Sequence, residues 1–160
     1  MIKTSPVLAA LAALLTAACS VTHQSRPATG GFMALSVADI EITADWYERH
    51  FDMQTIVSAE RPPPDGEVRL LRAGNLIVEL QQRQDAIDRH AAEAGFRAAH
   101  RTTGIFKSGL IVADIDAVFA ALQSSGADIV HPIVRTPDAL GLRTFAVRDP
   151  EGNMIQIFGD

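Results

Sequence analysis

The sequence predicts an α+β fold built from two copies of a βαβββ unit. The first observation is an internal repeat: Val37-Ala38-Asp39-Ile40 recurs as Val112-Ala113-Asp114-Ile115, an offset of 75 residues. The second is that a short apolar run precedes each copy and a helical pattern follows it. The third is that three strand-like segments follow each predicted helix. A repeat at fixed spacing indicates that one supersecondary unit occurs twice.

A helix is expected directly after each copy of the repeat, because apolar residues recur there at helical spacing. Asp39 and Asp114 stand at the N-cap positions, where a carboxylate accepts backbone N–H bonds and favours the positive end of the helix. Gly126 is a suitable stop for the second helix. The apolar faces comprise Ile40, Ala44, Tyr47 and Phe51 in the first helix and Ile115, Val118, Phe119 and Leu122 in the second.

Turn residues separate the expected strands. Each unit has a Gly-Asn pair before its last strand, and Asp149-Pro150-Glu151-Gly152 carries the residues that a type I turn favours. The segment 61–66 holds three prolines and must be a loop, because proline cannot donate to a sheet ladder. Residues 82–106 are interpreted as a linker with a short surface helix at 84–93. The expected strands span 32–35, 53–59, 67–73, 76–80, 109–111, 128–134, 142–148 and 154–158.

Residues 1–18 predict a lipoprotein signal peptide. Lys3 provides a positive start, and the 12 residues from Val7 to Ala18 are uncharged, a length typical of a signal-peptide core and too short for a bilayer-spanning helix. The stretch Leu15-Thr16-Ala17-Ala18-Cys19 resembles the lipobox of bacterial lipoproteins, in which the cysteine is lipidated. Cys19 is the only cysteine, so no intrachain disulfide can form. An ordinary signal peptide followed by a chance cysteine is the alternative.

The mature chain is therefore expected to begin at Cys19, with a flexible tether over 19–31 that is rich in Ser, Thr, Pro and Gly. Ser20 stands where many enteric lipoproteins of the inner membrane carry a retention Asp, so we expect an outer-membrane lipoprotein that faces the periplasm. The folded domain should span 32–160, with units at 32–81 and 107–160. A net charge of -5 without a basic cluster excludes nucleic acid as a partner.

The two units, with Val-x-Asp-Ile opening each helix and Asp-Pro-x-Gly-Asn before the last strand, resemble the vicinal oxygen chelate superfamily. That superfamily includes glyoxalase I, extradiol dioxygenases and the fosfomycin and bleomycin resistance proteins. The resemblance covers about Phe32 to Asp160 and implies that the units pair into a cup-shaped mixed sheet. It also implies a ligand site in the cup. Members of the family often form homodimers, and the sequence leaves pairing of two chains open.

In the enzymes of this family, a divalent metal is held by the first and last strand of each unit. The matching positions here are Phe32, Glu79, Lys107 and Gln156. Only Glu79 is a usual metal ligand, since Phe has no lone pair, Lys⁺ is a cation and Gln offers one neutral oxygen. We therefore expect no metal and no other cofactor. Family members of the bleomycin resistance type bind a ligand in the cup without chemistry.

Three hypotheses follow from the resemblance. The first is a metal-free protein that binds a small molecule in its cup through Phe32, Ser36, Glu79, Lys107 and Gln156. The second is a lyase or isomerase of glyoxalase type, with Glu79 as catalytic base and Lys107, or a differently placed metal, as electrophile. The third is a structural lipoprotein whose cup is filled by side chains.

Three of the proposed site residues allow more than one interpretation. Glu79 and Lys107 could form an ion pair that orients a ligand, or a solvated pair that only holds the halves together. Phe32 could stack on a planar ligand or fill the space of the lost metal. A metal site outside the family pattern, built from His100, His131 and Glu79, also stays open, although nothing in their spacing indicates it.

The lipoprotein hypothesis predicts how the protein fractionates. Wild-type protein should sediment with the outer membrane, because a lipidated Cys19 holds it there. The Cys19→Ala variant has no sulfur to modify, so it should be released or left unprocessed, as measured by immunoblotting of separated membranes. Unchanged outer-membrane fractionation of Cys19→Ala would refute the anchor.

Overall fold

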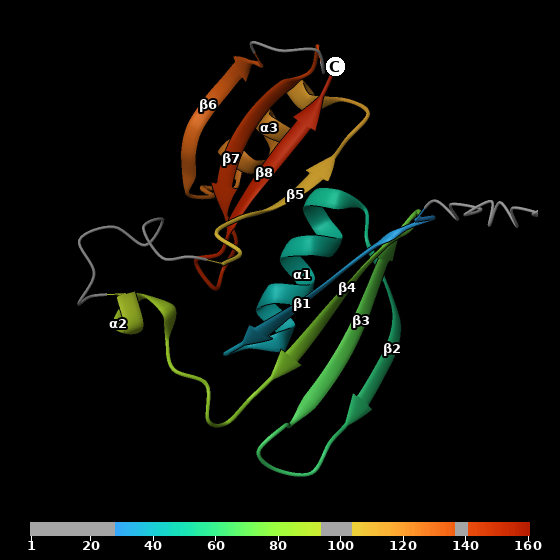
Figure 1. Cartoon of the computed structure of the whole chain (residues 1–160), viewed down its shortest axis with the longest axis vertical. Helices are drawn as coiled ribbons and strands as arrows, with labels where there is room; N and C mark the ends of the chain where they lie inside the picture. The colour runs from blue at the N-terminus through green and yellow to red at the C-terminus, as the bar shows by residue number, and fades with distance from the viewer. Residues whose placement is uncertain (1–27, 94–103, 137–140) are drawn as a thin grey trace, which may run out of the picture.

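The computed structural model describes residues 28–93, 104–136 and 141–160, so the predicted signal peptide and Cys19 lie outside the described residues. Within the described ranges, no helix is long and apolar enough to cross a membrane. The chain runs strand, helix and three strands twice, with a five-residue helix in the connecting segment (Figure 1). In order the elements are β1 (Gly31–Val37), α1 (Ile40–Phe51), β2 (Gln54–Glu60), β3 (Glu67–Ala73), β4 (Leu76–Gln82), α2 (Arg89–Glu93), β5 (Ser108–Ile111), α3 (Ile115–Ser124), β6 (Ile129–Arg135), β7 (Arg143–Arg148) and β8 (Met154–Gly159).

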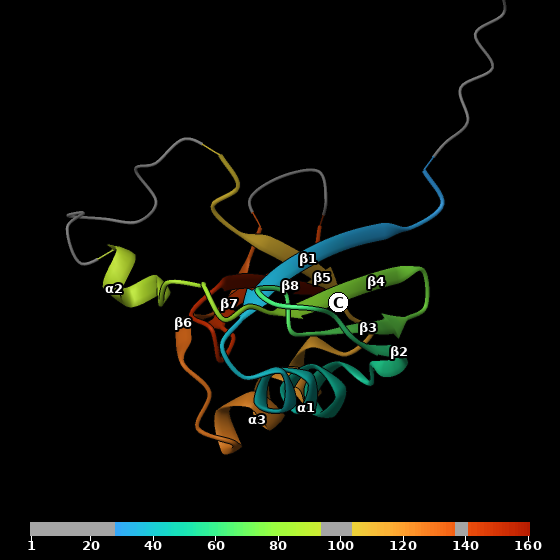
Figure 2. The ribbon, with the colours of Figure 1, turned by 90° about the horizontal axis from the view of Figure 1, so that it is seen from below.

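The two halves form sheets of identical topology. One sheet has the strand order β1-β4-β3-β2 and the other β5-β8-β7-β6. In each sheet the first strand is parallel to the last strand of its unit, and the remaining pairs are antiparallel. Seen from below, α1 and α3 lie side by side on the same side of the two sheets (Figure 2). The predicted α+β fold of two βαβββ units is confirmed.

The repeat residues occupy equivalent places in the two halves. Asp39 and Asp114 are the N-caps of α1 and α3, both in extended conformation with φ of -133°. The carboxylate of Asp39 accepts from the Ile42 N–H at 3.0 Å, and that of Asp114 accepts from the Ala117 N–H at 2.9 Å. Each bond satisfies one of the N–H groups that a helix start leaves without a partner. Gly126 follows α3 with φ of +76°, a conformation that favours glycine.

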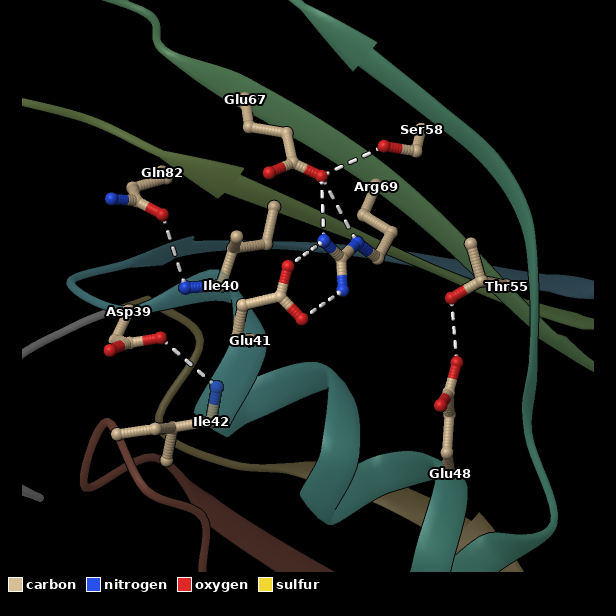
Figure 3. A network of polar contacts seen from close by, with 10 residues as sticks. All are labelled: Asp39, Ile40, Glu41, Ile42, Glu48, Thr55, Ser58, Glu67, Arg69 and Gln82. Atoms are coloured by element: carbon tan, nitrogen blue, oxygen red, sulfur yellow. Dashed lines mark hydrogen bonds and ion pairs between the residues drawn. The ribbon is translucent and has the colours of Figure 1, made fainter.

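A polar network fixes the start of α1 on its own sheet (Figure 3). Arg69 of β3 donates through Nη1 to Glu41 of α1 at 3.0 Å and through Nε to Glu67 at 3.1 Å. The Gln82 side chain, at the end of β4, accepts from the Ile40 N–H at 3.2 Å. Because the guanidinium hydrogen-bonds both carboxylates, it lowers the pKa of Glu41 and of Glu67. The first helical turn therefore has a defined position over the sheet.

Strand alternation separates a core face from an open face in each sheet. Val78 and Leu80 of β4 and Ile155 and Ile157 of β8 are fully buried against the helices. Glu79 and Gln156 stand between these residues and therefore point to the opposite face. Both are half-buried. The expected strands differ from the observed ones by one to two residues at several ends. For example, β1 continues to Val37 because its pairing with β4 continues to that residue.

The β7–β8 turn joins the two halves through hydrogen bonds, one of which is buried. The Tyr47 hydroxyl of α1 donates to Oδ2 of Asp149 at 3.0 Å, and Asp149 is only 4 % exposed. The other carboxylate oxygen, Oδ1, accepts the N–H groups of Glu151 and Asn153 within the turn. Glu151 in turn accepts from the Ala38 N–H and the Thr43 hydroxyl, each at 3.0 Å. Burial raises the pKa of Asp149, whereas these donors favour its ionised form.

The Tyr47–Asp149 bond predicts a measurable loss of stability. Tyr47→Phe keeps the ring but removes the one donor that the described part of the first half supplies to the Asp149 carboxylate. We expect the free energy of unfolding to fall by about 2 kcal/mol, the usual cost when a buried charged acceptor loses a donor. Chemical denaturation measures it. Ser58→Ala, which also deletes a hydroxyl that hydrogen-bonds a carboxylate but at an exposed site, should change it by less than about 0.5 kcal/mol. Equal effects of the two substitutions would contradict this role.

Candidate functional site

A cavity of about 860 Å³ lies along the free edge of β1. We call it the seam cavity, because β1 and β5 are the outer strands of their sheets and face the seam between the two halves (Figures 1 and 2). Its walls come from β1, from the connecting segment around α2, from the residues that lead into β5, and from the β7–β8 turn. The lining residues are Phe32, Met33, Ala34, Leu35, Ser36, Ala38, Arg83, Ala86, Ile87, Asp88, Arg89, Ala92, Ile105, Phe106, Lys107, Ser108, Glu151, Asn153 and Met154.

The structure gathers three of the five predicted ligand residues in this cavity and leaves two outside. Phe32, Ser36 and Lys107 line it. Glu79 and Gln156 do not, because each lies within its sheet, on the strand next to the outer strand. Glu79 is the Cα partner of Ala34, and Gln156 is the Cα partner of Gly109. The family ligand positions are therefore split between the seam and the open sheet faces.

Glu79 and Lys107 do not form the ion pair that the sequence interpretation considered. Within the described residues, no hydrogen bond or ion pair joins them. Lys107 directly precedes β5 and is exposed, and its ammonium nitrogen lies 5.3 Å from the centroid of the neighbouring Phe106 ring. Glu79 lies in the middle of β4. The interpretation assumed that both side chains project from strands, whereas Lys107 belongs to the approach to a strand.

The Gln156 side chain is held by a polar contact within its own sheet. Its Nε2 donates to the Thr144 hydroxyl at 2.9 Å, and that hydroxyl donates to the Ile157 carbonyl oxygen at 2.7 Å. The amide is thereby oriented on the open face of the second sheet. It can offer its carbonyl oxygen to a ligand on that face, but it does not reach the seam cavity.

Large apolar side chains are unusually exposed around the seam cavity. Phe32 is 63 % exposed, Ile87 79 %, Ile105 93 % and Phe106 47 %. Single exposed apolar residues need no explanation, but a cluster of them around a concavity marks a binding site. Ile87, Ile105 and Phe106 were missed by the sequence analysis, which took their segment as a polar linker. The adjacent pair Ile105-Phe106, directly before Lys107, was the available signal.

Most charged groups in the cavity wall are already engaged by the protein itself. Arg83 pairs with Asp65 at 2.7 Å and with Asp85 at 2.9 Å. Asp88 accepts from the Ala91 N–H, and Glu151 accepts the two donors from the start of α1. Arg89 also has an interaction of its own. Among the described residues, no carboxylate pairs with Lys107.

The family's metal does not fit the residues at the four ligand positions. Phe32 has no atom that can coordinate a metal, and the positive charge of Lys107 would repel a metal cation. The amide nitrogen of Gln156 donates a hydrogen bond to Thr144, so only its neutral carbonyl oxygen could face a metal. Over the described ranges, no three His, Cys, Asp or Glu side chains gather closely enough to hold a metal ion. Of the other metal set considered, His100 lies outside the described residues. No chemical step is therefore derived through a metal.

A smaller apolar cavity of about 360 Å³ lies at the other end of the seam. It is lined by Gly31 and Leu76 of the first sheet, Phe51 at the end of α1, and Gly109 and Ile111 of β5, together with Met53, Ala73, Asn75, Leu110 and Val112. This second cavity carries no charged side chain.

The fold of this chain resembles that of several proteins of known structure. A search of curated protein sequences finds no match. Among solved structures, a glyoxylase/bleomycin resistance protein/dioxygenase domain from Frankia sp. EAN1pec is 17 % identical, with a TM-score of 0.64 over 84 % of this chain and 97 % of that chain. TioX from Micromonospora sp. ML1 is 25 % identical, with a TM-score of 0.56 over 81 % of this chain and 94 % of its own.

An enzyme of the group is also similar in structure. It is the trypanothione-dependent glyoxalase I of Leishmania major, which is 15 % identical to this chain. The TM-score is 0.57 over 80 % of this chain and 84 % of that chain. Identities this low show the fold alone. The family model of the Glyoxalase/Bleomycin resistance protein/Dioxygenase superfamily matches residues 30–157. The chain therefore belongs to the Glyoxalase/Bleomycin resistance protein/Dioxygenase superfamily, the vicinal oxygen chelate fold.

Proposed function

We propose that this chain is a lipid-anchored envelope protein that binds a small organic molecule in the seam cavity without a metal. One observation carries the proposal: Phe32 and Lys107, which match two of the family's four metal-ligand positions, line a cavity and offer no usual metal ligand there. An aromatic ring and an ammonium group can bind an organic ligand, whereas neither coordinates a cation.

The dimensions and lining of the cavity support this function. A volume of about 860 Å³ falls within the range of about 300–1,000 Å³ that is typical of small-molecule sites. Such sites have mostly apolar walls and a few polar groups that fix the orientation of the ligand. The exposed Phe32, Ile87 and Ile105 provide the apolar wall, and Lys107 and Ser36 provide polar groups. An open cavity of this kind also argues against a purely structural role.

Catalysis of glyoxalase type has weaker support than binding. That hypothesis uses Glu79 as a base and Lys107 as an electrophile acting on one substrate. In the structure, Lys107 lines the seam cavity and Glu79 does not. A molecule bound in the seam cavity therefore meets the ammonium group without the carboxylate that would remove a proton.

The proposed location follows from the N-terminal sequence. Lipidation at Cys19 would hold the protein on the outer membrane. The domain would then face the periplasm, where the seam cavity meets molecules that cross the envelope.

The metal-free part of the proposal predicts the result of a metal titration. Wild-type protein, stripped with a chelator and titrated calorimetrically with zinc or nickel, should show no tight stoichiometric binding, because only Glu79 of the family set is a usual ligand. One equivalent of metal that stays bound through gel filtration would overturn the metal-free reading and favour the enzyme hypothesis.

The binding part predicts the result of a thermal-shift screen. Ligands of the seam cavity should raise the melting temperature equally with and without chelator, because they bind the native state without a metal. Ser36→Trp should abolish these shifts, because the bulky indole would project into the cavity beside β1 and block the ligand. The matched control Ser124→Trp, on the exposed face of α3, should keep them. A screen in which both variants behave alike, or in which every shift needs added metal, would refute the proposed site.

A further inference from the structure

We propose that the ligand of the seam cavity is an anionic amphiphile: an apolar chain or ring that ends in a single acid group, with the acid paired to Lys107. This inference rests on the proposed function and names its ligand class. The shared chemistry is one anion at the end of an apolar body, and a carboxylate or a phosphate could supply it.

The apolar part of the ligand is indicated by side chains from two separate segments. Phe32 and Ala34 of β1 line one side of the cavity. Ile87, which lies in the connecting segment just before α2, lines another part of it. Ile105 and Phe106 extend the apolar wall up to Lys107. Ile105 is 93 % exposed and Ile87 79 %. An apolar ligand body would remove these side chains from water, and that burial favours binding in proportion to the area covered.

The acid group is indicated by the charges in the wall. Both carboxylates that line the cavity already accept hydrogen bonds from the protein: Asp88 accepts the Ala91 N–H, and one oxygen of Glu151 accepts the Ala38 N–H and the Thr43 hydroxyl. A cationic ligand would share these carboxylates with the donors that they already bind. Lys107 meets no carboxylate among the described residues, so an acid can pair with it without breaking an ion pair.

The position of Lys107 suits an acid at one end of an elongated ligand. Its ammonium nitrogen lies 5.3 Å from the Phe106 ring centroid, a cation–π contact that holds the charge beside the apolar wall. An acid bound to this ammonium would direct the attached chain along Ile105 and β1. The ligand is thereby oriented by one polar contact and bound mainly by its apolar body, as in many small-molecule sites.

The test compares ligands of equal length and different charge. Mature chain from Cys19 to Asp160 carrying Cys19→Ser needs no detergent, which would compete for the cavity. Calorimetric titration with octanoate, octyl phosphate, 1-octanol and octylammonium, below their aggregation limits, gives four affinities. We expect at least one of the two acids to bind about tenfold more tightly than octanol. Octylammonium should bind most weakly. From hexanoate to octanoate the affinity should rise about threefold per added methylene.

Variants at the cation separate a charge contact from a structural effect. Lys107→Met keeps an apolar stem and should reduce acid binding about tenfold while leaving octanol binding unchanged. Lys107→Arg should retain the preference for acids. Arg135→Met, which removes an exposed cation on β6 outside the cavity, should leave all four affinities unchanged.

The possible outcomes distinguish this inference from the proposed function. If octanol binds as tightly as both acids and Lys107→Met changes neither, the anionic class is wrong and binding in the seam cavity stands. If none of the four probes binds while other compounds give thermal shifts that Ser36→Trp abolishes, the amphiphile proposal is wrong, and the proposal of binding in the seam cavity stands. If no compound of any class gives such a shift, both proposals fall. A preference for octyl phosphate over octanoate would identify phosphate as the source of the anion and support the class.

Discussion

The buried carboxylate of Asp149 is the contact on which the arrangement of the two halves depends. It accepts two backbone N–H groups and the Asn153 side-chain amide of its own turn, and the Tyr47 hydroxyl of α1, which belongs to the other half. An ionised carboxylate this deeply buried is tolerated only when donors surround it, so the turn and the helix must stay in contact. Glu151, two residues later, then reaches the start of α1. The same turn places Glu151, Asn153 and Met154 in the wall of the seam cavity.

The duplicated fold therefore yields an asymmetric site. The two sheets share strand order, and Asp39 and Asp114 cap their helices in the same way. The seam between them is not symmetric, because the β7–β8 turn and the connecting segment close one end and a small uncharged cavity occupies the other. Two residues at positions that match the family's metal ligands, Phe32 and Lys107, line the first of these two ends. Under the proposed function, they form part of the wall of an organic-ligand site.

Features that depend on neighbouring residues could be predicted from the sequence, and features that depend on how the halves meet could not. The helix caps, the turn at 149–152 and the strands follow from local patterns, since N-caps and type I turns are set within four residues. Ile87 and Phe106 belong to a segment with no periodicity, so their place in the cavity wall had no local signature beyond the short apolar pair before Lys107. The considered ion pair between Glu79 and Lys107 was wrong for the same reason. Strand alternation predicts which face of its own sheet a side chain points to, but not the distance between residues of two different sheets.

The central claim is that a ligand binds in the seam cavity, beside Phe32 and Lys107, and not on the open sheet faces that carry Glu79 and Gln156. The most direct measurement is a titration of isotope-labelled protein with octanoate, followed by backbone amide chemical shifts. The account predicts that the largest shifts map to β1 and to residues 105–108, while the amides of Glu79 and Gln156 change little. Large shifts centred on Glu79 and Gln156, with β1 and residues 105–108 unaffected, would contradict it.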